Sequence, residues 1–240
     1  MKYQYITIER EFGSGGTRIG ELLAKECKMP CYGREILERV ARKYDISVEQ
    51  IEQYEEGVTN SFLYTVFVMS KAQSGDMNML SDEGKVYLAE QAAIQSLAQN
   101  GSAVFMGHCA SEALKDRKGV VKVFIHADDA FKQKRIQEDY QISPNRMEFL
   151  RKKYDKKRAN YYRANTMKRW DDYRNYDIVL NSGELGIEGC VKVTERPAGL
   201  IVIRMINWTM AGNFERMLNL RNCHVNVIKH QCPLCVKSRK

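Results

Sequence analysis

Short apolar runs alternate with amphipathic segments along most of the chain. The apolar runs read as buried strands of a parallel sheet, and they lie at Tyr5–Ile8, Pro30–Tyr32, Ser102–Met106, Val120–His126 and Asp177–Leu180. Apolar residues at helical spacing predict helices over Thr17–Lys28, Arg34–Tyr44, Ser47–Gln53, Val86–Gln99, Asp128–Tyr140 and Leu185–Val193. Strands that alternate with helices in this way predict an α/β fold with three layers and a largely parallel sheet.

Two shorter patterns add detail. Ser47 and Gln50 have the spacing of a capping box, which predicts a helix start at this point. The stretch from Thr59 to Met79 is rich in Met and aromatic residues. Such a stripe predicts a packed helix, because apolar stripes usually face a core. A partner surface or a homodimer contact is the alternative.

The composition fits one globular domain with an extension. Of 240 residues, 44% are hydrophobic, which is enough to build a core and excludes disorder as a global description. No apolar run approaches the ~18 residues of a membrane span, and the acidic residues in the start MKYQYITIEREFG do not fit a signal peptide. We therefore expect a cytoplasmic protein that has no membrane partner.

The net charge of +8 comes from two segments. Residues 144–169 carry ten Lys and Arg against two acidic residues, and residues 194–240 carry eight against two. Residues 1–193 sum to only +2. The basic isoelectric point is therefore no evidence for a nucleic-acid partner.

A glycine-rich loop separates the first strand from the first helix and reads Arg-Glu-Phe-Gly-Ser-Gly-Gly. Glycines let backbone N–H groups converge on one point, and the following helix places its positive end there, so the loop suits a polyphosphate. A tight strand–helix turn is the alternative. Against the pattern G-x-x-x-x-G-K-[ST], Gly15 and Thr17 match, whereas Arg10 replaces the first glycine and Gly16 replaces the lysine.

The basic segment after Pro144 places three candidates on one helical face. Arg151, Asp155 and Arg158 follow one another at intervals of four and three residues. Two guanidinium groups that flank a carboxylate suit a site where phosphate and hydroxyl groups meet. A solvated helix with ion pairs along its surface is the alternative.

In this order, the loop and the basic segment resemble the P-loop nucleoside monophosphate kinases, and more specifically the cytidylate kinase-like family. The motifs that carry the resemblance are Glu9–Gly16, Pro30–Glu35, Val104–Ala110, VFIHADDAFKQKRI, Tyr154–Tyr162 and Leu180–Gly183. The resemblance covers about residues 3–193, so we expect one domain over residues 1–193. It implies a three-layer P-loop NTPase fold with a five-stranded parallel sheet and a helical lid at about residues 144–176.

The resemblance also implies a function and its site residues. The function is ATP-dependent phosphoryl transfer to a nucleoside monophosphate, with CMP or dCMP as first candidates and ATP and Mg²⁺ as cofactors. The donor phosphates would be bound by Gly13, Ser14, Gly15, Gly16, Thr17 and Arg18, with the Thr17 hydroxyl near Mg²⁺. The acceptor would be bound by Arg34 and His108, and the catalytic residues would be Arg10, Arg151, Asp155 and Arg158. Arg10, Arg18 or a lid cation would replace the charge of the missing loop lysine.

The segment Gly107–Leu114 departs from the family pattern. His108 stands where the family has an arginine, and Ser111 stands where it has an aspartate. An arginine is always charged, whereas a histidine is mostly neutral near pH 7. A non-catalytic nucleotide-binding regulator is therefore the alternative function, and a buried structural histidine is the alternative role of His108. A nucleic-acid binder is disfavoured, because the tyrosines that could stack on bases are interleaved with the lid residues.

The chain continues beyond the kinase-like region, from Thr194 to Lys240. Its last 18 residues hold three of the seven cysteines and two of the four histidines, namely Cys223, His224, His230, Cys232 and Cys235. The spacing of Cys232 and Cys235 is that of a zinc knuckle, but tetrahedral zinc needs four ligands, and Cys223 with His224 is a poor second pair. We expect a basic tail of undetermined order, with zinc binding as the alternative.

Overall fold

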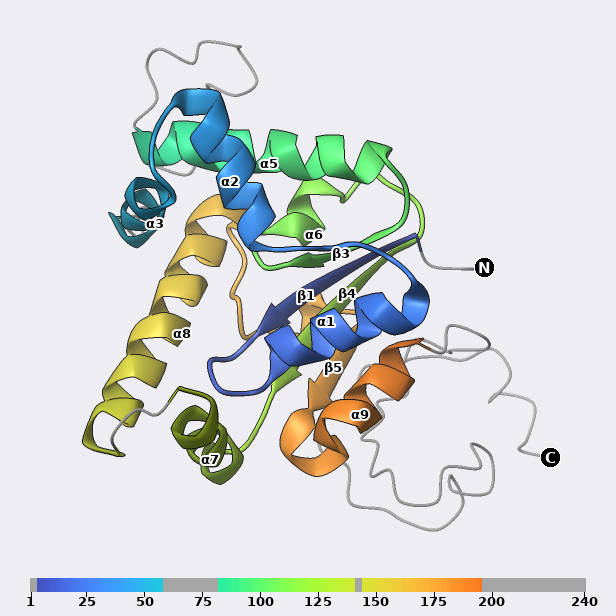
Figure 1. Ribbon diagram of the computed structural model, residues 1–240, viewed down its shortest axis with the longest axis vertical. Helices are drawn as coiled ribbons and strands as arrows, with labels where there is room; N and C mark the ends of the chain where they lie inside the picture. Colours follow the sequence, from blue (N-terminus) through green and yellow to red (C-terminus); the bar gives the residue numbers. More distant parts are fainter. Residues whose placement is uncertain (1–3, 58–81, 141–143, 196–240) are drawn as a thin grey trace, which may run out of the picture.

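A computed structural model describes residues 4–57, 82–140 and 144–195 (Figure 1). The predictions made for Thr59–Met79 and for the tail beyond Glu195, including its cysteines, lie outside the described residues. No helix in the described ranges is long and apolar enough to cross a membrane.

Five strands form one parallel sheet in the order β2-β3-β1-β4-β5. The strands are β1 (Tyr5–Arg10), β2 (Cys31–Tyr32), β3 (Ala103–Met106), β4 (Val120–His126) and β5 (Ile178–Asn181). The central strand β1 pairs through Tyr5 with Ala103 of β3 and Val120 of β4. The predicted α/β fold with a five-stranded parallel sheet is confirmed.

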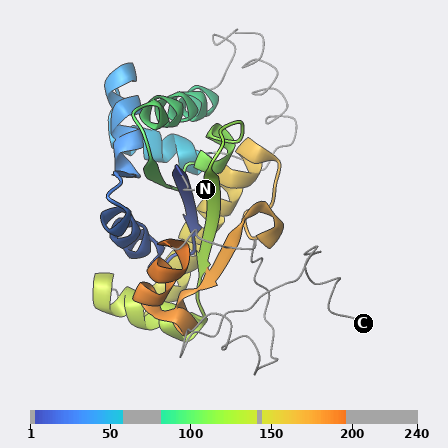
Figure 2. The same cartoon turned by 90° about the vertical axis from the view of Figure 1, so that its right-hand side faces the viewer.

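Helices cover both faces of the sheet (Figures 1 and 2). They are α1 (Gly16–Cys27), α2 (Arg34–Tyr44), α3 (Val48–Gly57), α5 (Asp82–Gln99), α6 (Ala110–Ala113), α7 (Asp129–Tyr140), α8 (Pro144–Thr166) and α9 (Ser182–Glu195), with a 3-10 turn at Tyr173–Asn175. The capping box before α3 is confirmed, because the Ser47 N–H donates to Gln50 Oε1 (2.9 Å) and the Gln50 N–H donates to Ser47 Oγ (3.1 Å). The short helix α6 was not predicted, and α9 is interrupted at Gly186, whose φ is 67°.

Alternation along the strands divides the core between the two faces. Ile6 and Ile8 of β1 pack with α1 and α9, while Tyr5 of the same strand packs with Ile36 of α2 and Ile94 of α5. Successive strand residues point to opposite faces, so a strand with both faces covered is apolar on both. This explains why the central strands read as continuous apolar runs.

The parallel strands all end at the same edge of the sheet, where the glycine-rich loop connects β1 to α1 and α8 crosses nearby (Figure 1). The second part of the predicted lid is not separate from the body. Tyr161, Tyr162 and Trp170 are buried in one cluster with Phe124 of β4 and Tyr176. Only the first part of α8, up to Arg158, therefore has the position of a lid.

Candidate active site

The glycine-rich loop folds around the side chain of Ser14. This side chain is fully buried; its Oγ donates to the backbone oxygen of Glu11 (2.8 Å) and accepts the N–H of Gly16 (3.3 Å). Ser14 thus fixes the shape of the loop by replacing bonds that the turn leaves unmade. Its hydroxyl forms both of these hydrogen bonds within the loop.

A cavity of about 430 Å³ opens over this loop and the start of α1. Five of the predicted phosphate-binding residues line it, namely Gly13, Gly15, Gly16, Thr17 and Arg18. We call it the donor cavity. Arg10, Arg135 and Arg158 also line it. Four arginines and three carboxylates, those of Glu11, Glu21 and Asp139, line the cavity, and together with the helix N-terminus they give it a net positive character that favours an anion.

Arg10 occupies the space that a side chain at position 16 would need. A Cβ on Gly16 would lie 2.4 Å from the Cβ of Arg10, and a Cβ on Gly107 would lie 2.5 Å from its Nη1. The Arg10 side chain therefore extends from the loop to the turn after β3. A lysine at position 16 does not fit beside it, so the Arg10 side chain lies next to the position of the usual loop lysine.

A second cavity, also of about 430 Å³, lies beside the first, between the ends of β1 and β3, α2 and α8. We call it the acceptor cavity. Arg34 and His108 line it, and so do the buried Glu9 and Tyr161. Arg10 and Arg158 line both cavities, so the two spaces meet at this pair of cations.

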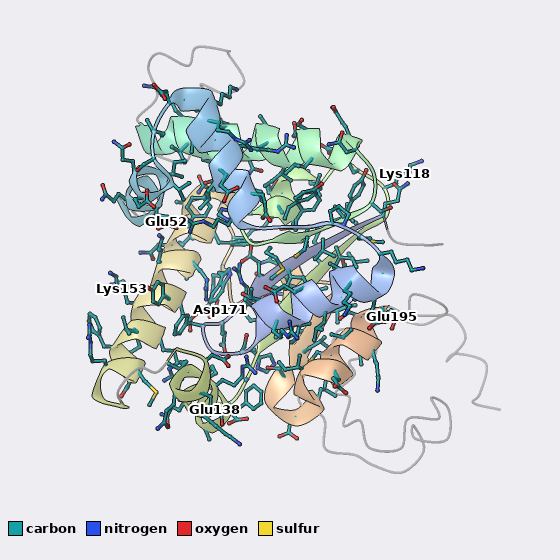
Figure 3. All side chains as sticks on the ribbon, in the orientation of Figure 1. Glu52, Lys118, Glu138, Lys153, Asp171 and Glu195 are labelled. Atoms are coloured by element: carbon teal, nitrogen blue, oxygen red, sulfur yellow. The ribbon has the colours of Figure 1, made fainter. Side chains whose placement is uncertain are left out.

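The Arg34 side chain stands at the rim of the acceptor cavity. Its Nε lies 3.7 Å from Glu38 and its Nη1 lies 4.0 Å from Glu52, and 63% of the side chain is exposed. Glu52 belongs to α3, at the position labelled in Figure 3 beside α8, where its backbone oxygen also accepts a hydrogen bond from Lys157 (3.1 Å). Such exposed ion pairs are weak, so Arg34 can exchange these partners for a phosphate.

His108 lines the acceptor cavity and is also largely buried. Its side chain is only 15% exposed, and its Nδ1 lies 3.5 Å from Oε2 of the fully buried Glu90, which also accepts a hydrogen bond from the hydroxyl of Tyr161. Gly107, His108 and Cys109 all have φ between 52° and 73°. Consecutive left-handed residues are costly outside glycine, and such strain is concentrated at functional sites.

The lid residues contact the loop directly. Oδ1 of Asp155 accepts the N–H of Phe12 (2.7 Å) and the Nη1 of Arg158 (3.3 Å), and this Nη1 also donates to the backbone oxygen of Arg10 (3.2 Å). The Tyr154 ring stacks on the Phe12 ring at 4.8 Å. Burial raises the pKa of Asp155. Asp155 lines neither cavity, so it orients Arg158 and closes the lid on the loop.

Arg151 does not join the other two members of the predicted triplet. It forms an ion pair with Asp129 of α7 and lines neither cavity. The three residues share a helical face, but four residues advance an α-helix by about 6 Å. Arg151 therefore meets α7 while Arg158 meets the loop.

A family model described as the cytidylate kinase-like family matches residues 5–184, which is three quarters of the chain. The chain belongs to the cytidylate kinase-like family. Among solved structures, an uncharacterized protein from Eubacterium ventriosum ATCC 27560 is similar, with 25% identity, a TM-score of 0.59, and coverage of 79% of this chain and 94% of that chain. Shikimate kinase from Bacteroides thetaiotaomicron matches with 15% identity, a TM-score of 0.43, and coverage of 80% and 96%. A comparison with curated proteins finds no match.

Two residues of this cytidylate kinase-like site escape prediction from the sequence. Arg135 of α7 lines the donor cavity, and its Nε would lie 3.1 Å from a Cβ on Gly15. Glu9 lines the acceptor cavity, is 7% exposed, and accepts a hydrogen bond from Trp170 Nε1 (3.0 Å). A buried acidic residue in a strand is unusual, so the position of Glu9 at the end of a predicted buried strand could have marked it as a site residue. Arg135 had no such signal, because its helix has many cations.

The donor cavity can accommodate a hydrated Mg²⁺ ion beside a polyphosphate. Thr17 contributes a hydroxyl at its wall, and the described residues contain no group of three His, Cys, Asp or Glu side chains placed to hold a metal. Mg²⁺ usually keeps several waters and takes one or two protein oxygens together with phosphate oxygens. A single hydroxyl ligand fits that pattern of binding.

Proposed function

We propose that this protein transfers a phosphoryl group from ATP to a nucleoside monophosphate, with CMP and dCMP as the first candidates. The observation that carries the proposal is the meeting of two cavities of equal size at Arg10 and Arg158. A phosphoryl donor and its acceptor must approach each other at the point where positive charge is concentrated. Membership of the cytidylate kinase-like family supports the same reaction class.

The loop and the start of α1 would hold the donor phosphates. Backbone N–H groups of the loop and the start of α1 would bind phosphate oxygens at a helix N-terminus, except those of Ser14 and Gly16, which donate within the loop. Arg135 and Arg18 would neutralise further charge. Thr17 would be the protein ligand of Mg²⁺. Mg²⁺ held there would neutralise charge on the donor phosphates.

Arg10 and Arg158 would act on the phosphoryl group during transfer. Because the transition state is loose, the reaction needs little covalent help from the protein and depends on positioning and charge. Arg158 is held for this task by Asp155, and Arg10 is held by packing against Gly16. Arg34 and His108 would bind the acceptor phosphate from the other side.

A panel of nucleoside monophosphates tests the proposal directly. Full-length protein is incubated with ATP, Mg²⁺ and one acceptor at a time, and nucleotides are separated by chromatography. We expect a nucleoside diphosphate together with equimolar ADP, fastest with CMP or dCMP. The Lys153→Met variant serves as a control, because Lys153 lies on the outer side of α8 (Figure 3) and lines neither cavity. No diphosphate from any acceptor would rule out the proposed activity.

His108 favours one alternative, a non-catalytic nucleotide-binding regulator. The donor cavity is complete, whereas the acceptor cavity has His108 and its partner Glu90 where the family pattern has an arginine. The variant His108→Arg separates the two functions. A weakened kinase gains turnover and a lower KM for the acceptor, whereas a regulator binds ATP but remains inactive with either residue.

A further inference from the structure

Helix α7 packs directly against the glycine-rich loop. A Cβ on Gly13 would lie 2.9 Å from the side chain of Ile136 and 3.1 Å from the backbone oxygen of Lys132. The φ of Gly13 is 82°, which also favours glycine. The other side of α7 faces α8 (Figure 1). α7 therefore contacts both the loop and the lid, which also contact each other directly at Phe12.

Lys132 of α7 is a buried cation shared by two carboxylates. Its side chain is 8% exposed, and its Nζ lies 2.8 Å from Oε2 of Glu11 and 3.2 Å from Oδ1 of Asp129. Glu11 lines the donor cavity, and its Oε2 also accepts the N–H of Ala127 (3.4 Å). A carboxylate at this place would repel a polyphosphate unless its charge were neutralised. Lys132 supplies that neutralisation without entering the cavity.

Asp129 connects this pair to the lid. The same Oδ1 that faces Lys132 accepts a hydrogen bond from Nη1 of Arg151 on α8. The Arg151 side chain is 13% exposed and that of Asp129 is 67% exposed, so this contact forms at the edge of the helix interface. Four groups of alternating charge thus run from the donor cavity to the lid, in the order Glu11, Lys132, Asp129, Arg151. We call them the ion-pair chain.

We infer that the ion-pair chain couples lid closure to the phosphate loop, so that Arg151 and Lys132 are positioning residues. Arg151 fixes the start of α8 on α7, and Asp155 and Arg158 then reach the loop one and two turns later. Lys132 pairs with the Glu11 carboxylate and offsets its charge near the donor phosphates, and the same ammonium group also pairs with Asp129. The inference rests on the proposed function in one respect, that a nucleoside triphosphate occupies the donor cavity.

A double-mutant cycle tests the loop end of the chain. Binding of ATP with Mg²⁺, without an acceptor, is measured by calorimetry for the full-length protein, Lys132→Met, Glu11→Gln and the double variant. Lys132→Met leaves the Glu11 charge uncompensated, so we expect a Kd about 10- to 100-fold higher. The double variant removes the unpaired charge and should return to within about 3-fold of the native Kd. A double variant that binds as poorly as Lys132→Met overturns the coupling.

Amide exchange of Phe12 tests the lid end without any nucleotide. The Phe12 N–H donates to Asp155, so its exchange rate reports how often the lid opens. We expect Arg151→Met to raise this rate at least about 10-fold, and Lys153→Met, the same charge change on the exposed side of the same helix, to leave it unaltered. Equal rates in both variants overturn the role of Arg151. This variant changes a contact between two helices, so it keeps the inference testable even if Lys132→Met does not fold.

The two experiments separate this inference from the proposed reaction. If no acceptor is turned over, but Arg151→Met still speeds Phe12 exchange and the binding cycle still shows rescue, the ion-pair chain is supported and the kinase activity is ruled out. If CMP is turned over while both variants behave like the native chain, the kinase activity is supported and the coupling through the ion-pair chain is ruled out.

Discussion

Helix α8 is held at its two ends by contacts of different kinds. Its first part meets the loop and α7 mainly through charged and polar groups, with Arg151 on Asp129, Asp155 on the Phe12 amide, and Arg158 on the backbone of Arg10. A small apolar contact accompanies them, because Tyr154 stacks on Phe12 and Met147 packs with Phe12 and Ile136. Its last part is buried among aromatic residues, including Tyr162 against Tyr176 at 6.4 Å between ring centroids. The first part of α8 can therefore separate from the loop, whereas its last part stays packed in the aromatic cluster.

This difference teaches where the lid ends. Ion pairs near the surface contribute little each and weaken with salt, whereas a buried aromatic side chain contributes several times more. Opening the active site thus requires only the first part of α8 to separate from the loop. The aromatic cluster keeps the helix attached to β4 throughout. Four variants or conditions test this division.

The largest effect is expected in the aromatic cluster, at Trp170. Its ring lies 5.1 Å from that of Phe124, edge to face, and its Nε1 donates to the buried Glu9. Trp170→Ala removes the ring and leaves a buried carboxylate without this donor, so we expect the free energy of unfolding to fall by about 4 kcal/mol. Urea unfolding followed by circular dichroism measures it. Trp170→Phe retains most of the packing and should lose less than half as much; equal losses would contradict the packing argument.

Arg158 should show the opposite profile, with a large effect on turnover and a small one on stability. It lines both cavities and forms a largely buried pair with Asp155, with side chains 26% and 23% exposed. We expect Arg158→Met to lower kcat about 1000-fold, as for arginines that stabilise a transferring phosphoryl group, and to lower the free energy of unfolding by no more than about 2 kcal/mol. Steady-state kinetics and urea unfolding are measured on the same preparation. A kcat within about 5-fold of the native value would remove Arg158 from the reaction.

Salt should distinguish the two ends of α8. Raising NaCl from about 0.05 M to about 0.5 M shortens the distance over which charges interact. We expect the Phe12 amide to exchange about 3-fold faster, because Arg151 and Arg158 hold the lid through ionic contacts, while the amide of Tyr162 keeps its rate. Exchange is followed by mass spectrometry or NMR. A parallel increase at both amides would mean that the helix loosens as one unit.

The smallest effects concern pH, and they have opposite signs at two aspartates. Burial raises the pKa of Asp155, so its ionised form disfavours the fold; Asp155→Asn should be relatively most stable at neutral pH, and its advantage should shrink as pH falls through the raised value. The hydrogen bond from Arg151 lowers the pKa of Asp129, so Asp129→Asn should cost stability above the ordinary Asp value, and this cost should vanish as pH falls through the lowered one.

Each aspartate effect should stay within about 1 kcal/mol. Urea unfolding of the native protein and both variants at a series of pH values between about 3.5 and 7 measures them. Curves of the same sign for the two variants would show that Asp155 and Asp129 do not differ in the way their surroundings indicate.

The fold could be predicted from the sequence because its signals are local. The strand end at His126 and the capping box at Ser47 depend on neighbouring residues alone, whereas β1 extends to Arg10, two residues beyond its predicted end at Ile8. The loop was recognisable for the same reason, since Gly13 to Thr17 are consecutive. The helix α6 has four residues and no periodic pattern, so no sequence window of useful length could reveal it.

The parts of the site that escaped prediction depend on packing between distant elements. Arg151 has the spacing of a catalytic partner for Arg158, but the position of α7 decides that it meets Asp129. Lys132 and Arg135 both belong to a basic run on α7. Lys132 pairs with Glu11 and Arg135 lines the donor cavity, and this difference depends on how α7 packs against Gly13. Helical spacing specifies a shared face and does not specify the neighbour that this face meets.

The close packing of Arg10 against Gly16 restricts how this loop can change. Gly16→Lys alone would force a side chain into the volume of Arg10, and Arg10→Gly alone would leave the loop without a central cation. Conversion to the conventional sequence therefore needs both substitutions at once, because either substitution alone disrupts the loop. An engineer who transplants a phosphate loop into this scaffold must exchange the two residues together.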